Sequence, residues 1–274
     1  SQQARKEGLA AIEQAYTAAA GKRKKQLESS RAENGWDGIT ASRPHGSGTE
    51  ADPYQIGTAQ ELAWLAYAVN NQTESGGFSA VLTADVDLGY CQWPVIGTRS
   101  SGSQRPYTGT FDGRGHTVSG LYITSLGGRQ KLGLFGVAQD AVIRNLTVRG
   151  SIERTGVRSY DGDTAGYLIG GLLGSGEGIG VTISNCVSQV DVSVSSANDL
   201  MAQRAAVGGL VGRLCGSGSH TLSDCRSEGR VYTAFAPGAC YLGGSGGDGG
   251  QAGIVGFISA GARLERCVNA GEVY

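Results

Sequence analysis

Acidic side chains come closest to a catalytic pattern in this chain. Asp85 and Asp87 are two positions apart, which would put both carboxylates on one face of a strand, and Asp112 follows in a similar phrase. Asp161 and Asp163 form a second pair. Glycoside hydrolysis uses paired carboxylates, and a calcium cluster uses several oxygen ligands. The first three acids lie in stereotyped phrases where structural turn roles are sufficient, so we assign no catalytic residue.

Histidine gives no recognisable metal or nucleophile pattern. His45, His116 and His220 are far apart, and none has a second His or Cys at ligand spacing. Ser219 and His220 lie near Asp224, but no nucleophile motif surrounds them. We therefore expect no metal and no cofactor.

Three of the six cysteines recur at one position of a repeated phrase. Cys186, Cys225 and Cys267 are best interpreted as small buried side chains, and we predict free thiols. Cys215 and Cys240 lie elsewhere, and whether they form a bridge is left open. The cysteine count alone does not decide the redox compartment.

The overall charge and hydropathy exclude several classes of partner. The chain of 274 residues has a formal net charge of −1, whereas a nucleic-acid-binding domain is usually basic. It holds no run of about 18 apolar residues, so we expect no membrane insertion. The first residues lack the apolar core of a signal peptide, and the chain begins with Ser. We therefore expect a mature fragment with further domains in the same parent chain.

The elements that must position these residues follow from an internal repeat. A glycine-apolar-apolar-glycine phrase begins at residues 133, 171, 209 and 253, so its steps are 38, 38 and 44 residues. A second landmark, Leu146, Cys186, Cys225 and Cys267, recurs in steps of 40, 39 and 42 residues. Two landmarks with nearly one period indicate a structural repeat, as in solenoids, propellers or arrays.

Each repeat contains three short apolar runs separated by turn residues. The runs alternate apolar and polar residues, which is typical of half-buried strands, and a repeat has no room for a well-formed amphipathic helix. A propeller blade would need four strands. We therefore predict an all-β, right-handed parallel β-helix, a solenoid in which equivalent residues stack. One inward ladder would contain Leu134, Leu172, Leu210 and Ile254.

Two helical elements are expected before the repeats. Residues 1–35 have apolar residues at helical spacing and form an N-terminal helix or connector. The Thr58 to Glu61 segment is a capping box, and the helix that it opens ends near Asn70 and Asn71. Because a solenoid needs a terminal cap, we assign that role to residues of about 40–80, with Trp64 and Tyr67 as packing groups.

The repeated phrases and the order in which they occur resemble those of GLUG-type repeat proteins of bacterial cell surfaces. The resemblance covers residues 36–274, with the repeats at about 120–274, and includes the lead-in phrases at residues 46–56, 58–66 and 111–121. It implies a secreted or cell-wall-attached, extracellular bacterial β-helix of the adhesin-like type. It implies no activity, because such repeats also occur beside enzymatic domains.

The repeats differ most after their third phrase. If the coils stack, the insertions at residues 154–169, 194–207 and 233–251 leave from the same corner, and repeat insertions often form a binding face. The candidate binding residues are the aromatic and acidic residues of these insertions: Tyr160, Asp161, Asp163, Tyr167, Phe235 and Tyr241. The alternative is that the aromatic residues cover the side of the solenoid.

Three functions remain open from the sequence. The leading hypothesis is a non-catalytic surface module that adheres to a host extracellular protein, immunoglobulins included, or to a glycan. The second is a rigid spacer within a larger surface protein. The third is a polysaccharide lyase or glycosidase, because parallel β-helices also carry such enzymes.

Overall fold

Parallel β-sheets and one α-helix make up the described part of this all-β protein. The computed structural model describes residues 36–71, 78–100, 103–124, 131–155, 167–196, 205–235, 250–258 and 261–274. The helix predicted within residues 1–35 lies outside these ranges. No described helix is long and apolar enough to cross a membrane.

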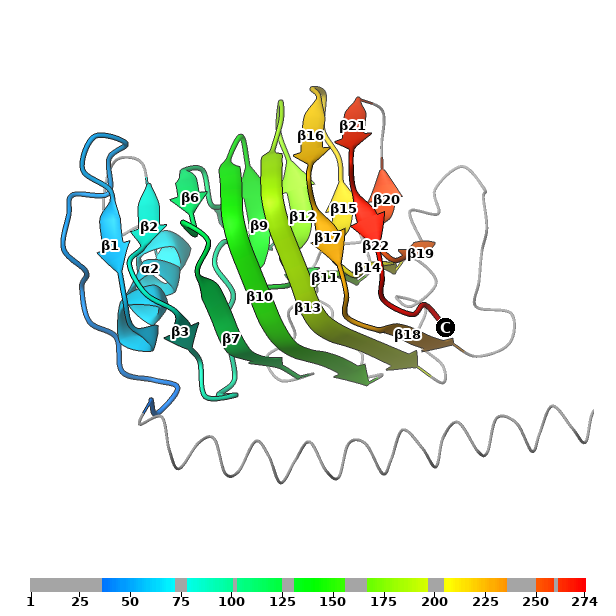
Figure 1. Ribbon diagram of the computed structural model, residues 1–274, viewed down its shortest axis with the longest axis horizontal. Helices are drawn as coiled ribbons and strands as arrows, with labels where there is room; N and C mark the ends of the chain where they lie inside the picture. Colours follow the sequence, from blue (N-terminus) through cyan, green and yellow to red (C-terminus); the bar gives the residue numbers. More distant parts are fainter. Residues whose placement is uncertain are drawn as a thin grey trace, which may run out of the picture.

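The largest sheet, called the long sheet here, runs the whole length of the described molecule (Figure 1). Its hydrogen-bonded order is β1 (Tyr54–Ile56), β2 (Ala80–Leu82), β6 (Thr110–Asp112), β10 (Val142–Thr155), β13 (Thr182–Ser196), β16 (His220–Ser223) and β21 (Ala262–Glu265). Beside this path lie β3 (Val86–Asp87), β7 (Thr117–Ile123), β17 (Arg226–Ser227), β18 (Val231–Phe235) and β22 (Val268–Asn269). All of these pairings are parallel.

Two further parallel sheets, each of four strands, lie beside the long sheet in the repeats. The first contains β8 (Lys131–Leu132), β11 (Leu168–Gly170), β14 (Ala206–Gly208) and β19 (Gly250–Ala252). The second contains β9 (Phe135–Gln139), β12 (Leu173–Glu177), β15 (Val211–Leu214) and β20 (Val255–Ile258). The chain visits the first, the second and the long sheet in turn, so each repeat adds one level to all three.

An antiparallel hairpin interrupts this pattern. It consists of β4 (Thr98–Ser100) and β5 (Ser103–Arg105). Ile96 before it and Tyr107 after it both form parallel bridges to β9. The hairpin therefore leaves from the edge of the second four-stranded sheet.

The two predicted ladders are confirmed by the strand register. Leu146 pairs with Cys186, and the side chains of Leu146, Cys186 and Cys225 are buried, with Cys267 partly buried. Leu134, Leu172 and Leu210 are likewise buried, and Ile254 is partly buried against the same core. Stacking equivalent residues at the inter-strand spacing gives every level the same apolar interior, so one core extends along the repeats. The five described cysteines are free thiols.

Each repeat has a corner residue directly before the position of the cysteine ladder, and these residues form a second, polar ladder. Asn145, Asn185, Asp224 and Arg266 all have left-handed backbone conformations, with φ between 50° and 55°. Asn and Asp tolerate this region better than most residues. The Asn145 amide donates to Asp112 at 3.0 Å, and the Asn185 amide donates to Asn145 at 3.0 Å. The corner side chains therefore join successive levels.

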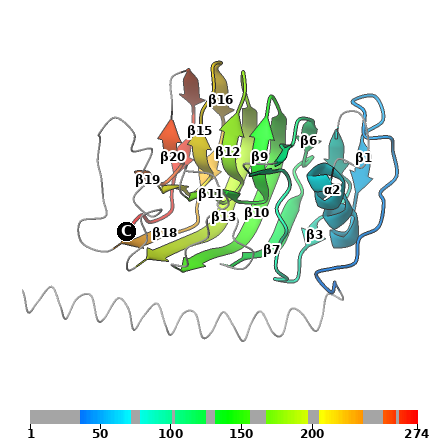
Figure 2. The same ribbon diagram turned by 180° about the vertical axis from the view of Figure 1, so that it is seen from behind.

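The cap predicted at residues 40–80 is built around α2 (Ala59–Asn71), which ends where the sequence predicted. Its capping box is present: Glu61 N–H donates to the Thr58 hydroxyl at 3.2 Å, and Thr58 N–H donates to the Glu61 carboxylate at 3.1 Å. Leu62 and Leu65 are fully buried. Figure 2 shows α2 beside the first strands, at the end of the stack opposite β20 and β21.

The lead-in covers the free edge of β1. Gln55 N–H donates to the carbonyl of His45 at 2.8 Å, which forms an antiparallel bridge. Trp64 packs edge-on against Tyr54, with ring centroids 5.1 Å apart, as expected of a packing group. The same prediction for Tyr67 is wrong, because its side chain is 57% exposed on the outer face of the helix.

Candidate functional site

The described ends of the three insertions stack on one another, as predicted. The chain leaves the long sheet at the ends of β10, β13 and β18, where Thr155 pairs with Ser195 and Ser196 pairs with Phe235. It returns at β11, β14 and β19, where Ala206 pairs with both Leu168 and Gly250. These departure and return points are called the insertion edge below. Figure 1 shows the ends of β10, β13 and β18 side by side.

Most of the predicted binding residues are not among those that the structure describes. Tyr160, Asp161, Asp163 and Tyr241 are outside the described residues. Phe235 is the last residue of β18, so its backbone belongs to the insertion edge. The structure therefore locates the roots of the insertions and leaves these five candidates as predictions.

The prediction for Tyr167 as a contact residue is wrong. Its side chain is fully buried and belongs to the continuous core. Arg154, which is also buried, places its guanidinium 4.6 Å from the centroid of the Tyr167 ring. A cation over an aromatic face is attractive, more so when both groups are desolvated. Tyr167 therefore anchors the root of the first insertion against the strand that precedes it.

The acids of the lead-in phrases make turn and corner contacts. Asp85 accepts the Thr117 N–H at 2.8 Å and lies 3.3 Å from Nδ1 of His116. Asp87 accepts the Gly89 N–H at 2.8 Å. Asp112 accepts hydrogen bonds from Asn145 and from Nε of Arg144 at 3.0 Å. These partners supply the structural role that the sequence indicated.

The electrostatics of these acids do not favour acid catalysis. The Thr117 hydrogen bond, with a smaller part from His116, holds the pKa of Asp85 below its usual range. Burial raises the pKa of Asp112, but hydrogen bonds from Asn145, Arg114 and Arg144 outweigh it, so the net pKa is lowered. A general acid at neutral pH needs a raised pKa. Both groups are shifted in the opposite direction.

A buried polar cluster near the hairpin was not foreseen from the sequence. The Glu177 side chain is nearly fully buried at the end of β12, forms an ion pair with Arg99, and accepts a hydrogen bond from the Ser175 hydroxyl at 3.1 Å. Arg99 is 78 positions away from Glu177, so no local pattern could reveal the pair. The pair fastens β4 to the second four-stranded sheet.

Cys215 belongs to the same cluster but is a poor nucleophile. Burial raises the pKa of its thiol, and Glu177 adds to this while Arg213 and Ser175 oppose it. The net shift is upward, so the thiol stays protonated at neutral pH, and the thiolate is the nucleophilic form. Cys240, its suggested partner, lies outside the described residues.

His220 serves the fold. It is fully buried, accepts the Val181 N–H on Nδ1 at 3.1 Å, and has Nε2 3.1 Å from the carbonyl of Cys215. Because Nδ1 is the acceptor, the proton is assigned to Nε2, which donates to that carbonyl. Both ring nitrogens are therefore used by backbone groups.

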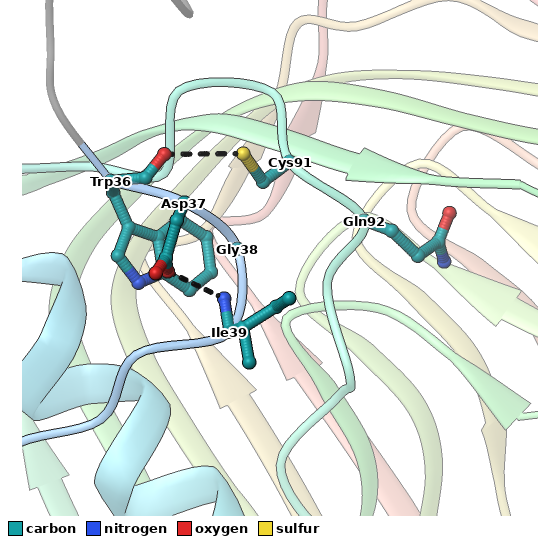
Figure 3. Close-up of a pocket in the computed structure, with 6 residues that line it drawn as sticks. All are labelled: Trp36, Asp37, Gly38, Ile39, Cys91 and Gln92. Atoms are coloured by element: carbon teal, nitrogen blue, oxygen red, sulfur yellow. Dashed lines mark hydrogen bonds between the residues drawn. The ribbon is translucent and has the colours of Figure 1, made fainter.

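A cavity of about 400 Å³ lies at the capped end (Figure 3). It is lined by Trp36, Asp37, Gly38, Ile39, Cys91 and Gln92. The Asp37 carboxylate accepts the N–H groups of Ile39 and Thr40 and the Thr40 hydroxyl, which lower its pKa to about 2. The Cys91 thiol donates to the Trp36 carbonyl at 3.5 Å. The Asp37 carboxylate and the Cys91 thiol are thus already hydrogen-bonded to neighbouring groups of the protein.

Comparison with known proteins gives no family for this chain. No family model matches it. Halomucin of Haloquadratum walsbyi is 31% identical over 115 residues, which cover 38% of this chain and 1% of that protein. A crystal structure from Bacteroides ovatus, provisionally named an immunoglobulin A1 protease, has a TM-score of 0.47 and 17% identity, with 84% of this chain and 70% of that chain covered. This chain thus spans about one hundredth of the length of Halomucin.

The insertion edge is the strongest candidate site that remains. Within the described ranges, no group of three or more His, Cys, Asp or Glu side chains is arranged to hold a metal ion. The acids, His220 and Cys215 each have a structural partner or an unfavourable pKa. The insertion edge instead presents three consecutive chain departures at fixed register.

Proposed function

We propose that this chain is a non-catalytic binding module of a bacterial surface protein. In this proposal its levels form a right-handed parallel β-helix of GLUG-type repeats, and the module is secreted or attached to the cell wall. The insertions bind a host extracellular protein, immunoglobulins included, or a glycan. Adhesion is the function that a rigid scaffold with variable loops supports best.

The stacked register of the insertion edge carries this proposal. Because Thr155 pairs with Ser195 and Ser196 with Phe235, successive insertions begin one strand spacing apart. A row of loops at fixed spacing can offer several contacts to a ligand at once, and the scaffold that carries them does not have to become ordered on binding. Preorganisation of this kind lowers the entropic cost of binding.

A binding experiment with a length-conserving variant tests the proposal. The variant carries Tyr160→Ser, Asp161→Asn, Asp163→Asn and Tyr241→Ser, so each insertion keeps its length. Tyr67→Ser, on the exposed face of α2, is the matched control. We expect the parent and the control to give a specific signal on an array of host extracellular proteins, immunoglobulins and glycans, and the variant to lose it. A signal that survives in the variant, with unchanged circular dichroism, would overturn the proposal.

A rigid spacer is the second candidate. One hydrophobic core runs from Trp36 to Val255, and parallel pairing continues from β1 to β21, which would make the chain stiff. The spacer function would be favoured if the chain bound no protein or glycan on the array. A polysaccharide lyase or glycosidase is the third, and it requires turnover of a polysaccharide that is lost in Asp85→Asn or Asp87→Asn.

A further inference from the structure

Two cysteine thiols of adjacent levels lie next to each other in the core. Val187 pairs with Arg226, so the residues directly before them, Cys186 and Cys225, occupy equivalent positions of neighbouring levels. Both side chains are buried, Cys186 completely and Cys225 with 1% exposed. In the sequence 39 positions separate them, so no local cysteine motif marks the pair. The strand register alone brings the two sulfurs together.

The two thiols point in the same direction. Each is shared between the backbone carbonyl two positions earlier and a carbonyl of the preceding level. For Cys186 the distances from Sγ to these two oxygens are 3.3 Å and 3.7 Å. For Cys225 they are 3.2 Å and 3.6 Å. Because the contacts repeat, the two sulfurs are separated by the spacing of neighbouring strands, about 4.8 Å.

That spacing matches a metal ion with two sulfur ligands in a line. A bond between a metal ion and a cysteine sulfur is about 2.3 Å long, so an ion midway between two sulfurs needs them about 4.6 Å apart. Soft sulfur ligands select copper(I), a monovalent ion that accepts two ligands in a line. The ladder places its sulfurs along one direction, whereas zinc prefers four ligands at the corners of a tetrahedron.

The two thiols differ in how readily they lose a proton. Hydrogen bonding from the Cys186 thiol, with smaller contributions from backbone groups and Cys267, outweighs burial and lowers the pKa of Cys225. Burial raises the pKa of Cys186. The pair thus favours one thiolate, at Cys225, beside one neutral thiol. A monovalent cation between them gives a site with no net charge, and an uncompensated charge is costly in an apolar core.

We propose that Cys186 and Cys225 form a buried site for a soft monovalent cation, copper(I), held in a line between the two sulfurs. Binding breaks the S–H bond of Cys225 and forms a sulfur–copper bond, and the proton leaves to solvent. Cys186 keeps its proton and donates a sulfur lone pair. No electron is transferred. Because the site lies inside the stack, the ion enters while the chain folds or when levels open transiently.

The alternative is that these thiols only fill space. Free cysteine is among the most buried residue types and packs as a small apolar side chain. Leu146 pairs with Cys186 and is also buried, so the same ladder accepts a side chain that binds no metal. Thiols that only pack would retain no copper after competition with a small thiol. A two-sulfur site would retain one ion for each chain.

The test is copper retention by the 274-residue chain. The chain is refolded without oxygen in the presence of copper(I) and ascorbate, and is then washed with glutathione as the competing thiol. Copper content, proton release and the X-ray absorption spectrum are measured. We expect one ion per chain with two sulfur neighbours, and one proton released per ion. Loading should also raise the thermal midpoint, because the ion binds the folded state.

Single variants locate the ion. Cys186→Ala and Cys225→Ala each remove one of the two sulfurs. We expect each to weaken copper binding by more than about 100-fold, since loss of a group that only supports a metal ligand already costs about 10–100-fold. Cys91→Ala is the matched control, because the Cys91 thiol is also buried and donates to a backbone carbonyl, but lies at the capped end. We expect the control to retain the ion.

A parent chain that retains no copper would overturn the proposal and leave the ladder as packing. Retention in both ladder variants, or a spectrum without two sulfur neighbours, would also overturn it, because the ion would then bind elsewhere. The spectrum of the parent decides even if circular dichroism shows that an alanine variant does not fold. Neither cysteine belongs to an insertion, so the array experiment and this one can fail separately.

Discussion

The two ends of the stack of levels differ in what covers the last backbone edge. At the first end the lead-in bridges β1 at His45, and α2 places Leu62 and Leu65 in the core. At the last end Leu264, which continues the same ladder as Leu222, is 40% exposed. The comparison teaches that a repeat leaves the apolar residues of its outermost strand exposed unless another segment packs on them. At β1 that segment is the lead-in with α2, which does not belong to the repeat.

Truncation of an apolar residue should have its largest effect at the capped end. Leu65→Ala removes a fully buried side chain, and we expect it to lower the free energy of unfolding by about 2–5 kcal/mol. Leu264→Ala should cost less than about 1 kcal/mol, because the site is already open to water. Urea denaturation in dilute solution measures both. Equal losses would contradict the contrast between the ends.

Two equivalent glycines should also respond differently. A Cβ at Gly209 would overlap the Ser227 hydroxyl and the backbone carbonyl of Gly253, and neither is free to move in the interior of the stack. We expect Gly209→Ala to destabilise by about 1–3 kcal/mol through overpacking. A Cβ at Gly253 meets the exposed side chain of Asn269, which can rotate away. Gly253→Ala should therefore shift the thermal midpoint less, and a larger shift would count against the difference.

The capping box of α2 offers a smaller effect that belongs to the capped end alone. Thr58→Ala removes the acceptor of the Glu61 N–H, and we expect a loss of about 1 kcal/mol in the free energy of unfolding. Thr58→Ser keeps a hydroxyl and should retain most of the stability. Chemical denaturation of the two variants side by side is the measurement. Identical losses would mean that the hydroxyl does not act as a cap.

Acid should weaken the corner contacts, to different extents along the stack. The pKa of Asp112 is lowered in the folded protein, so its carboxylate stabilises the fold above the unfolded value of about 3.9. That contribution is lost as the pH falls through the lower folded pKa. We expect Asp112→Asn to flatten the decline of the thermal midpoint at low pH.

Asp224→Asn is the matched variant at a corner further along the stack. The Arg266 hydrogen bond lowers the pKa of Asp224, but both side chains are largely exposed. Solvent screens such a pair, so we expect a smaller change in the acid profile than for Asp112→Asn. Thermal scans at a series of pH values would show this order, and the reverse order would contradict it.

The levels and their ladders could be predicted because the same phrases recur in the sequence at a nearly constant period. Cys186 and Cys225 stand at one position of two phrases, and in-register parallel pairing brings equal positions together. The polar corner ladder had a signal that was missed, since Asn145, Asn185 and Asp224 recur directly before the cysteine position. Their left-handed conformation is the one for which Asn and Asp are favoured.

Other features had no signal in local sequence. Tyr167 lies near the end of the first insertion, where its position predicts a contact residue, but Arg154 on the preceding strand packs over its ring, which is buried in the core. Glu177 is buried against Arg99 from a hairpin 78 positions earlier. Both depend on which strands become neighbours, and spacing along the chain does not report this.

By itself, the sequence determined the period, the inward apolar positions, the helix α2 with its cap, and the order in which insertions occur. These follow from alternation, capping chemistry and repetition, each of which acts over a few residues or at a fixed step. Only the tertiary structure decided that the insertion roots pair at one edge, that Tyr167 is buried, and that the lead-in and α2 cover β1. Those outcomes depend on long-range pairing, because burial and strand edges are properties of the assembled stack.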